Sequence, residues 1–250
     1  MPPVPNKPAS VPAGAAQFPQ TLWSVVLLAG QSSSLQSQEA LATLCRAYWF
    51  PLYAYLRRQG KSPHDAQDLT QGFLAHLLEK NTLSRAQRTK GKFRSFLLAS
   101  LQYFLADERD KAQAQKRGGG ATLIALDNRD AEQRYQAQPV EKLDPAKVFE
   151  RRWAMTLLDR TLSRLEAEFA GPGRKERFEQ LQVFLLGEPK TISYAEAGKR
   201  IGIKEGAVKV AVLRLRQRFR ELLRAEIAST VANEQEVEEE MRYLFTTLCG

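Results

Sequence analysis

The chain has 250 residues, 43% of them apolar, and a formal net charge of +9 at neutral pH. This length suits one large or two small domains that each bury a core. The basic charge favours a polyanionic partner but does not separate DNA from RNA or a membrane surface. Because Cys45, Cys249, His64 and His76 are isolated, we expect neither a disulfide framework nor a metal site.

The start of the chain shows no targeting or membrane-spanning segment. Residues 1–20 are rich in Pro and Ala and have no apolar core of signal-peptide length, which predicts a disordered arm. The apolar run at residues 23–29 is far too short to cross a bilayer. We therefore expect a cytoplasmic protein that does not bind membranes.

Two helices are predicted next from apolar residues at three- and four-residue steps. The first covers residues 39–60 and contains Pro51, which predicts a kink or a helix boundary there. The second begins at residues 62–63 and has Asp65 and Asp68 in its first turn, where the helix dipole favours acidic groups. A docking surface for a partner is the alternative explanation of these acids.

A third helix is predicted after a polar loop at residues 81–92. It covers residues 93–117, and its character changes at Asp107 from aromatic to charged. Glycines at residues 118–120 end it. Residues 118–145 have no clear apolar period, which predicts a flexible linker and a domain boundary.

The second half of the chain is also predicted to be helical. Amphipathic helices are expected from residue 146 to the Gly-Pro-Gly at 171–173, and then over residues 174–186. No convincing strand alternation appears anywhere in the sequence. The predicted fold is all-α, with two small helical domains joined by a flexible linker.

Residues 191–224 have the pattern of a helix-turn-helix, whose second helix can lie in the DNA major groove. Ser193 is placed to cap the first helix, and Gly202 provides a turn with positive φ. The small Ala197 and Gly198 lie where two crossing helices would touch.

The second helix of this pair, which begins near Lys204, belongs to a strongly basic segment. Its cations are opposed mainly by Glu205 and Glu221, which favours phosphate contact. A solvated helix hairpin is the alternative. The cations of the segment are Lys199, Arg200, Lys204, Lys209, Arg214, Arg216, Arg218, Arg220 and Arg224.

The C-terminal tail, residues 226–250, is predicted to form an acidic helix. Its residues Val237, Met241, Leu244 and Leu248 share one face. The helix could be solvated, or it could pack on the body and place its acids near the basic recognition helix, restraining DNA binding.

The order of these parts is more specific than the helix-turn-helix alone. DAQDLTQGFLAHLL (65–78) precedes FRSFLLASLQYFLADERDKAQAQKR (93–117), and ISYAEAGKRIGIKEGAVKVAVLRLRQRFRELL (192–223) follows the predicted linker. In this order the chain resembles the extracytoplasmic-function sigma factors of bacterial RNA polymerase, over roughly residues 40–117 and 150–224. The resemblance implies a region-two-like domain at 21–117 and a region-four-like domain at 146–225.

The resemblance also implies three sets of functional residues. The expected contacts with the clamp helices of the polymerase β′ subunit are Asp65, Asp68, Leu69, Gln71 and Phe73. Those with the minus-ten promoter element are Phe96, Gln102, Asp107, Arg109, Lys111, Lys116 and Arg117. Those with the minus-thirty-five element are Lys204, Glu205, Gly206, Lys209, Val210, Arg214 and Arg218, of which the last two are assigned to phosphates.

The chain departs from the family pattern at several of these positions. Phe96 stands where the family often has Trp, and Gln102 where it often has Asn; both retain stacking or hydrogen-bonding capacity. Val210 and Ala211 replace a frequent Ser-Arg pair, so the promoter sequence of the family is not transferable.

No nucleophile–base pair or nucleotide-binding loop is found, so neither enzymatic activity nor a cofactor is expected. The expected partners are core RNA polymerase and promoter DNA, and the family also allows an anti-sigma factor. Two other classes compete with this interpretation. A ligand-responsive helix-turn-helix repressor would bind DNA without polymerase. An RNA-binding helical protein is favoured only by the general basicity.

Overall fold

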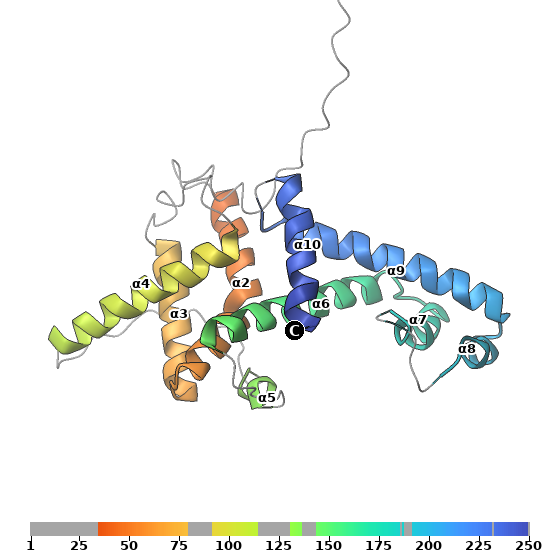
Figure 1. Ribbon diagram of the computed structural model, residues 1–250, viewed down its shortest axis with the longest axis horizontal. Helices are drawn as coiled ribbons and strands as arrows, with labels where there is room; N and C mark the ends of the chain where they lie inside the picture. Colours follow the sequence, from red (N-terminus) through yellow and green to blue (C-terminus); the bar gives the residue numbers. More distant parts are fainter. Residues whose placement is uncertain are drawn as a thin grey trace, which may run out of the picture.

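The computed structural model describes residues 35–79, 92–114, 131–136, 144–185, 187, 192–231 and 233–249. Every regular element in these ranges is an α-helix (Figure 1), which confirms the predicted all-α class. None of the described helices has the length and apolar character needed to cross a membrane. The predicted N-terminal arm, the loop at 81–91, and Lys116 and Arg117 lie outside the described residues.

The first helices agree with the predicted pattern, and of the two alternatives predicted at Pro51 the helix boundary is excluded. α2 (Leu35–Arg58) continues through this proline, so no helix boundary lies there. Residues around it are deeply buried, with Leu52 and Ala54 both 0% exposed, and this packing compensates for the missing hydrogen bond. α3 (Pro63–Glu79) follows, and the Ser62 hydroxyl accepts a hydrogen bond from its first turn. α4 (Phe93–Ala114) then lies beside it in Figure 1.

Part of the predicted linker is ordered, which corrects the expectation of an unstructured connection. α5 (Ala131–Gln136) packs on α2 through the buried Tyr135. Its Glu132 accepts hydrogen bonds from the Arg57 guanidinium at 2.9 and 2.8 Å and from the Tyr53 hydroxyl. A six-residue helix has too few apolar positions to produce a period that a sequence shows.

Where the structure describes the second half of the chain, it forms two long helices and three shorter ones. α6 and α9 have 23 and 24 residues, so each is about 35 Å long at 1.5 Å per residue. They lie side by side in Figure 1 and form a helix pair that runs along the molecule. The bounds are α6 (Pro145–Ala167), α7 (Arg174–Gln182), α8 (Tyr194–Ile201), α9 (Glu205–Ala228) and α10 (Glu234–Cys249).

The buried side chains form two clusters, which divide along the length of α6 and α9. The first cluster joins α2–α5 to the beginning of α6, the end of α9 and α10. The second joins the end of α6 to α7, α8 and the beginning of α9. The clusters therefore do not separate at residues 118–145, because Phe149 and Trp153 of α6 are buried with α2. The Trp153 indole also donates a hydrogen bond to the Tyr48 hydroxyl of α2 at 3.0 Å.

The C-terminal helix packs on the body, as one of the two alternatives for the tail predicts. Val237 and Leu244 are 1% and 0% exposed and belong to the first cluster. Its acids do not approach the beginning of α9. Instead, Glu240 pairs with Arg94 at the start of α4, and Glu234 pairs with Arg224 near the end of α9. The structure therefore does not place the tail against the predicted recognition surface.

Candidate nucleic-acid interface

The α8–α9 pair has the cap and the turn expected from the sequence. The Ser193 hydroxyl accepts a hydrogen bond from the Glu196 N–H at 3.2 Å, which caps α8. Gly202 follows with φ of 71°, and the chain reverses there. A Cβ built on Gly198 would lie 2.6 Å from the Ile203 carbonyl oxygen, so this crossing requires glycine.

The packing of α9 decides which of its residues face solvent. Val208 and Val212 are 0% and 2% exposed and lie against Ala197 of α8 and its neighbours. The opposite side of α9 is therefore exposed to solvent near its beginning, where Lys209 lies 5.7 Å from the centre of the Tyr194 ring of α8. All of the residues predicted there for base contact are exposed: Lys204, Glu205, Gly206, Lys209 and Val210.

Two features of this exposed face were not predicted. Leu213 is 67% exposed, one turn beyond Lys209, and adds an apolar group to the surface. The Lys209 ammonium pairs with Glu205 at 2.7 Å, four residues before it. An exposed pair of this kind contributes about 0.5 kcal/mol or less, so a DNA phosphate or base can replace Glu205 at small cost.

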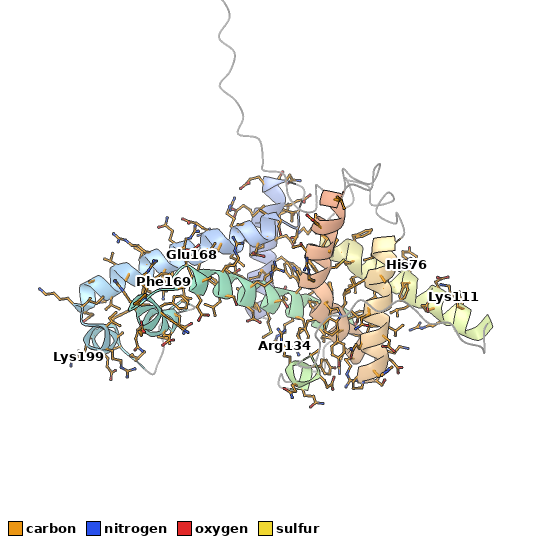
Figure 2. All side chains as sticks on the ribbon, turned by 180° about the vertical axis from the view of Figure 1, so that it is seen from behind. His76, Lys111, Arg134, Glu168, Phe169 and Lys199 are labelled. Carbon is orange, nitrogen blue, oxygen red and sulfur yellow. The ribbon has the colours of Figure 1, made fainter. Side chains whose placement is uncertain are left out.

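The two arginines assigned to phosphates occupy different environments. Arg218 is held by Glu168 at 2.6 Å and by Glu221 at 3.0 Å, and its hydrogen bonds lower the pKa of the Glu168 carboxyl. Arg214 is exposed and lines a groove of ≈ 730 Å³ between α7 and α9. Figure 2 shows Glu168 and Phe169 at the end of α6, beside this groove.

The groove brings in two further arginines that the sequence analysis did not assign. Arg174 and Arg177 of α7 line it together with Arg214 and Arg218. The sequence shows that these two arginines follow the Gly-Pro-Gly turn closely. Whether they face α9 depends on the tertiary packing, which the sequence does not show. Most of the groove lining is apolar, and it includes the buried Leu181 and the exposed Val210.

The aromatic half of α4 is partly core and partly surface. Phe104 packs against Phe73 with ring centroids 5.7 Å apart, which agrees with the expectation that it is a core residue. Phe96 is half-buried beside Phe93, so only part of its ring can meet a ligand. Tyr103, which the sequence analysis did not single out, is 79% exposed.

The polar half of α4 is exposed and internally paired. Gln102 is exposed and donates to the Tyr55 hydroxyl at 3.3 Å. Lys111 lies between Asp107 at 2.8 Å and Glu108 at 3.0 Å, and these hydrogen bonds raise the pKa of its ammonium. Arg109 is also exposed. These three- and four-residue steps place acids and bases together, and the described residues 107–114 contain three acids and two bases, so this part of the face has no net positive charge.

The predicted polymerase contacts on α3 divide into surface and core. Asp65 and Asp68 are exposed, and Leu69 is half-buried. Phe73 and Gln71 are 0% and 7% exposed, so in this structure they cannot contact a partner protein directly. They can only support the exposed residues of α3 through packing. This corrects their assignment as direct contacts: Phe73 belongs to the apolar stripe of α3, and Gln71 is buried beside it.

Metal-ligand clusters and reactive cysteines were sought among the described residues. No three His, Cys, Asp or Glu side chains gather there as metal ligands. Burial raises the pKa of the Cys45 thiol to about 12, so this cysteine is not a nucleophile at neutral pH.

Comparison of the chain with protein-family models, with curated proteins and with solved structures gives no match.

Proposed function

We propose that the chain is a sigma factor of the extracytoplasmic-function type, which binds core RNA polymerase and directs it to promoters. The observation that carries the proposal is the α8–α9 pair, with its serine cap, its glycine turn and an exposed basic face at the beginning of α9. The order of elements before it supports the same class. In this role the chain catalyses no reaction, needs no cofactor and works in the cytoplasm.

In the proposed complex, the beginning of α9 lies in the major groove of the minus-thirty-five element. Lys204 and Lys209 can donate to guanine, and Glu205 can accept from cytosine when DNA displaces it from its ion pair. Val210, which is 49% exposed, suits a thymine methyl group. Arg214 lies farther along the same helix and suits a phosphate, which positions the helix without reading sequence.

The exposed face of α4 is proposed to contact the minus-ten element. Gln102 and Tyr103 are adjacent and exposed, and an exposed tyrosine ring offers a surface on which an unpaired base can stack. Arg109 provides a cation on the same helix. Tyr103 therefore joins the residues proposed for promoter opening.

The acidic start of α3 is proposed to bind the β′ subunit of the polymerase. The Asp65→Lys, Asp68→Lys double variant tests this assignment by co-purification with core polymerase. We expect a loss of association of at least tenfold, because both carboxylates are exposed and their contacts with the Ser62 hydroxyl and with His64 lie at the surface, where a basic partner can replace them. The double variant Glu176→Lys, Glu179→Lys changes the charge equally on the exposed side of α7 and is the matched control. Equal association of the two variants would reject the docking site.

A ligand-responsive repressor is the second candidate, and the groove of ≈ 730 Å³ beside α9 favours it. A small molecule in this groove would touch Val210 and Arg214 and so compete directly with DNA. This candidate predicts tight binding to a two-fold symmetric site in the absence of polymerase. Footprinting of the chain alone, with polymerase added in a parallel sample, separates the two functions.

A further inference from the structure

A groove of ≈ 730 Å³ lies between α7 and α9, beside the end of α6. Small-molecule sites in proteins have volumes of about 300–1,000 Å³, and they are usually formed before the ligand binds. Two residues of the wall, Leu181 and Leu215, are 2% and 3% exposed and belong to the second cluster of buried residues. The core therefore holds this wall in place, and a ligand can enter the groove without a rearrangement of the backbone.

The lining of the groove offers an apolar ligand a surface to cover. Phe169 is half-buried, and its ring lies beside that of Phe178 with centroids 5.1 Å apart. Val210, on the α9 side, is 49% exposed. Covering such apolar surface contributes about 25 cal/mol per Å² removed from water. An aliphatic group in the groove gains this stabilisation, whereas an inorganic anion does not.

The same lining carries cations. The only acidic residue in it, Glu168, accepts hydrogen bonds from the Arg218 guanidinium at 2.6 and 2.9 Å, which lower the pKa of its carboxyl. Glu168 is therefore ionised at neutral pH and already held by one of the arginines. Within the described residues, Arg177 and Arg214 form no ion pair. The lining arginines, two from α7 and two from α9, are Arg174, Arg177, Arg214 and Arg218.

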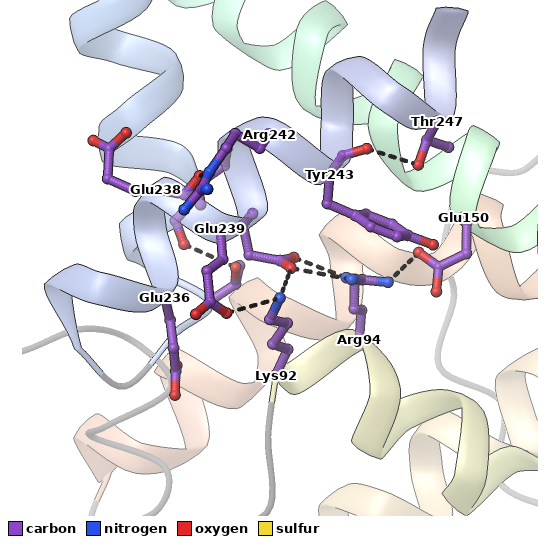
Figure 3. A network of polar contacts seen from close by, with 12 residues as sticks. Lys92, Arg94, Glu150, Glu236, Glu238, Glu239, Arg242, Tyr243 and Thr247 are labelled. Atoms are coloured by element: carbon purple, nitrogen blue, oxygen red, sulfur yellow. Dashed lines mark hydrogen bonds and ion pairs between the residues drawn. The ribbon is translucent and has the colours of Figure 1, made fainter. Parts of the chain in front are cut away.

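The groove arginines differ from the buried arginine in the ion-pair network at the start of α4. In that network the Glu240 carboxylate accepts hydrogen bonds from Lys92 and Arg94, and Arg94 also donates to Glu150. Figure 3 shows these side chains meeting from α4, α6 and α10. A cation that acids hold on two sides is not available to a ligand. The two groove arginines that lack such a partner are exposed, so an anion can reach them.

The combination of an apolar wall and exposed cations selects the chemistry of the ligand. DNA offers phosphates, but its backbone has no aliphatic chain that could fill the groove. A neutral apolar molecule would leave the arginines unused. A molecule with an apolar body and one terminal carboxylate satisfies both features, because a guanidinium binds a carboxylate through two parallel hydrogen bonds.

We propose that the groove between α7 and α9 binds an amphipathic anion, an aliphatic chain that ends in a carboxylate, and that this ligand excludes DNA from the beginning of α9. The chain covers Phe169 and Val210, and the carboxylate pairs with Arg177 and Arg214. Because Val210 and Arg214 also belong to the residues proposed to contact DNA, ligand and DNA compete for them. Only this competition rests on the proposed function; the binding of the ligand does not.

Calorimetric titration of the full chain measures the binding directly. The probe is decanoate below its micelle concentration. Acetate, which lacks the aliphatic chain, and decyltrimethylammonium, which carries the opposite charge, are the comparison compounds. We expect only decanoate to bind, with one site per protein molecule and a negative heat-capacity change, which marks the burial of apolar surface.

A pair of double variants locates the site. In Arg177→Gln, Arg214→Gln the Kd for decanoate should rise at least tenfold, because both charge-assisted contacts are lost. The matched control is Lys175→Gln, Arg220→Gln, which removes two exposed cations from the same two helices outside the groove lining. It should bind decanoate as the wild-type chain does. All four side chains are exposed, so neither variant removes a buried contact.

Fluorescence anisotropy of a labelled DNA duplex measures the competition. Decanoate at ten times its Kd should raise the apparent Kd for DNA about elevenfold, because exclusive ligands are linked by one plus the ratio of ligand concentration to its Kd. Acetate at the same concentration controls for ionic strength. The variant Arg177→Gln should weaken the effect of decanoate, and Arg177 is not among the residues assigned to DNA.

The remaining outcomes overturn the inference. Absence of decanoate binding would reject the site, and equal binding of acetate or of decyltrimethylammonium would reject the class of ligand. Equal Kd values in the two double variants would place the site elsewhere. A dimer that decanoate dissociates, detected by sedimentation, would show that a second copy of the chain fills the groove. Decanoate that binds without displacing DNA would reject the exclusion of DNA from α9.

These results are separate from a failure of the proposed function. Each of them leaves the sigma function intact, because none involves core polymerase. A chain that binds decanoate as expected but initiates no transcription with core polymerase would reject the sigma function and leave the ligand site in place.

Discussion

Replacing Glu240 with Gln should destabilise the protein far more than any neighbouring acid-to-amide change. The substitution keeps the size of the side chain but removes a charge that three hydrogen bonds from Lys92 and Arg94 hold in place. Arg94 keeps its contact with Glu150, and Lys92 can turn towards Glu239, which lies 3.6 Å away. The network is therefore weakened and not abolished.

The size of this loss of stability follows from the burial of the two side chains. The Glu240 side chain is 1% exposed and that of Arg94 is 7% exposed, so water cannot replace the lost partner. Removing one member of a buried ion pair costs about 3–5 kcal/mol, and the remaining contacts of Arg94 place this case near 3 kcal/mol. For a chain of this size, that corresponds to a fall in Tm of roughly 6–12 °C.

Thermal unfolding followed by circular dichroism measures this effect, with Glu239→Gln as the matched control. Glu239 is adjacent in sequence and meets the same lysine, but its side chain is 50% exposed. We expect its replacement to change stability by about 0.5 kcal/mol or less. If both variants melted within about 2 °C of wild type, the network would not stabilise α10 and the reasoning would be refuted.

Three further predictions concern the turn, the pH dependence and DNA binding. Gly198→Ala should destabilise by about 1–3 kcal/mol and abolish DNA binding, because the added Cβ would meet the Ile203 carbonyl. Arg57 hydrogen bonds lower the pKa of Glu132 to about 2, so its stabilising contribution is complete above about pH 5 and is lost as the pH falls towards 2. Glu132→Gln should therefore lower the free energy of unfolding at pH 7. At pH 3 the variant and the wild-type protein should differ less in this free energy, which urea unfolding measures. Replacing both Lys209 and Arg214 with Ala should reduce the slope of log K against log[salt] by up to about 2.

Each of these predictions has a control variant or an outcome that would contradict it. Gly206→Ala adds the same methyl group in open space and should leave stability unchanged or slightly raised. An equal stability deficit of Glu132→Gln at pH 7 and pH 3 would contradict its assigned titration. Lys147→Ala with Arg242→Ala removes two exposed cations elsewhere and should not alter the salt slope. An unchanged slope in the Lys209 and Arg214 variant would reject their contact with phosphate.

Structure that depends on local chemistry could be predicted from the sequence. The Ser193 cap and the Gly202 turn involve partners only a few residues away, and both were found where expected. The apolar stripe that contains Val237 and Leu244 likewise predicted the buried face of the last helix. In each case the residue type alone, a capping serine, a turn glycine or a run of apolar residues, indicates the local structure.

Contacts between distant residues could not be predicted in this way. Glu240 and Arg94 are 146 residues apart, and nothing in the acidic run distinguishes Glu240 from its exposed neighbours. α5 escaped prediction because its anchor, Glu132, has partners 75 and 79 residues earlier in the chain. Among the candidate site residues, Gln71 was misassigned because its burial depends on how α3 is packed.

The central claim is that the chain directs core RNA polymerase to DNA through two separate surfaces. Transcription from a pool of random-sequence templates by core polymerase, with and without the chain, tests it most directly. We predict chain-dependent transcripts whose templates share two sequence motifs at one fixed separation. Templates showing no enrichment, or a single symmetric motif enriched equally by the chain alone, would contradict the account.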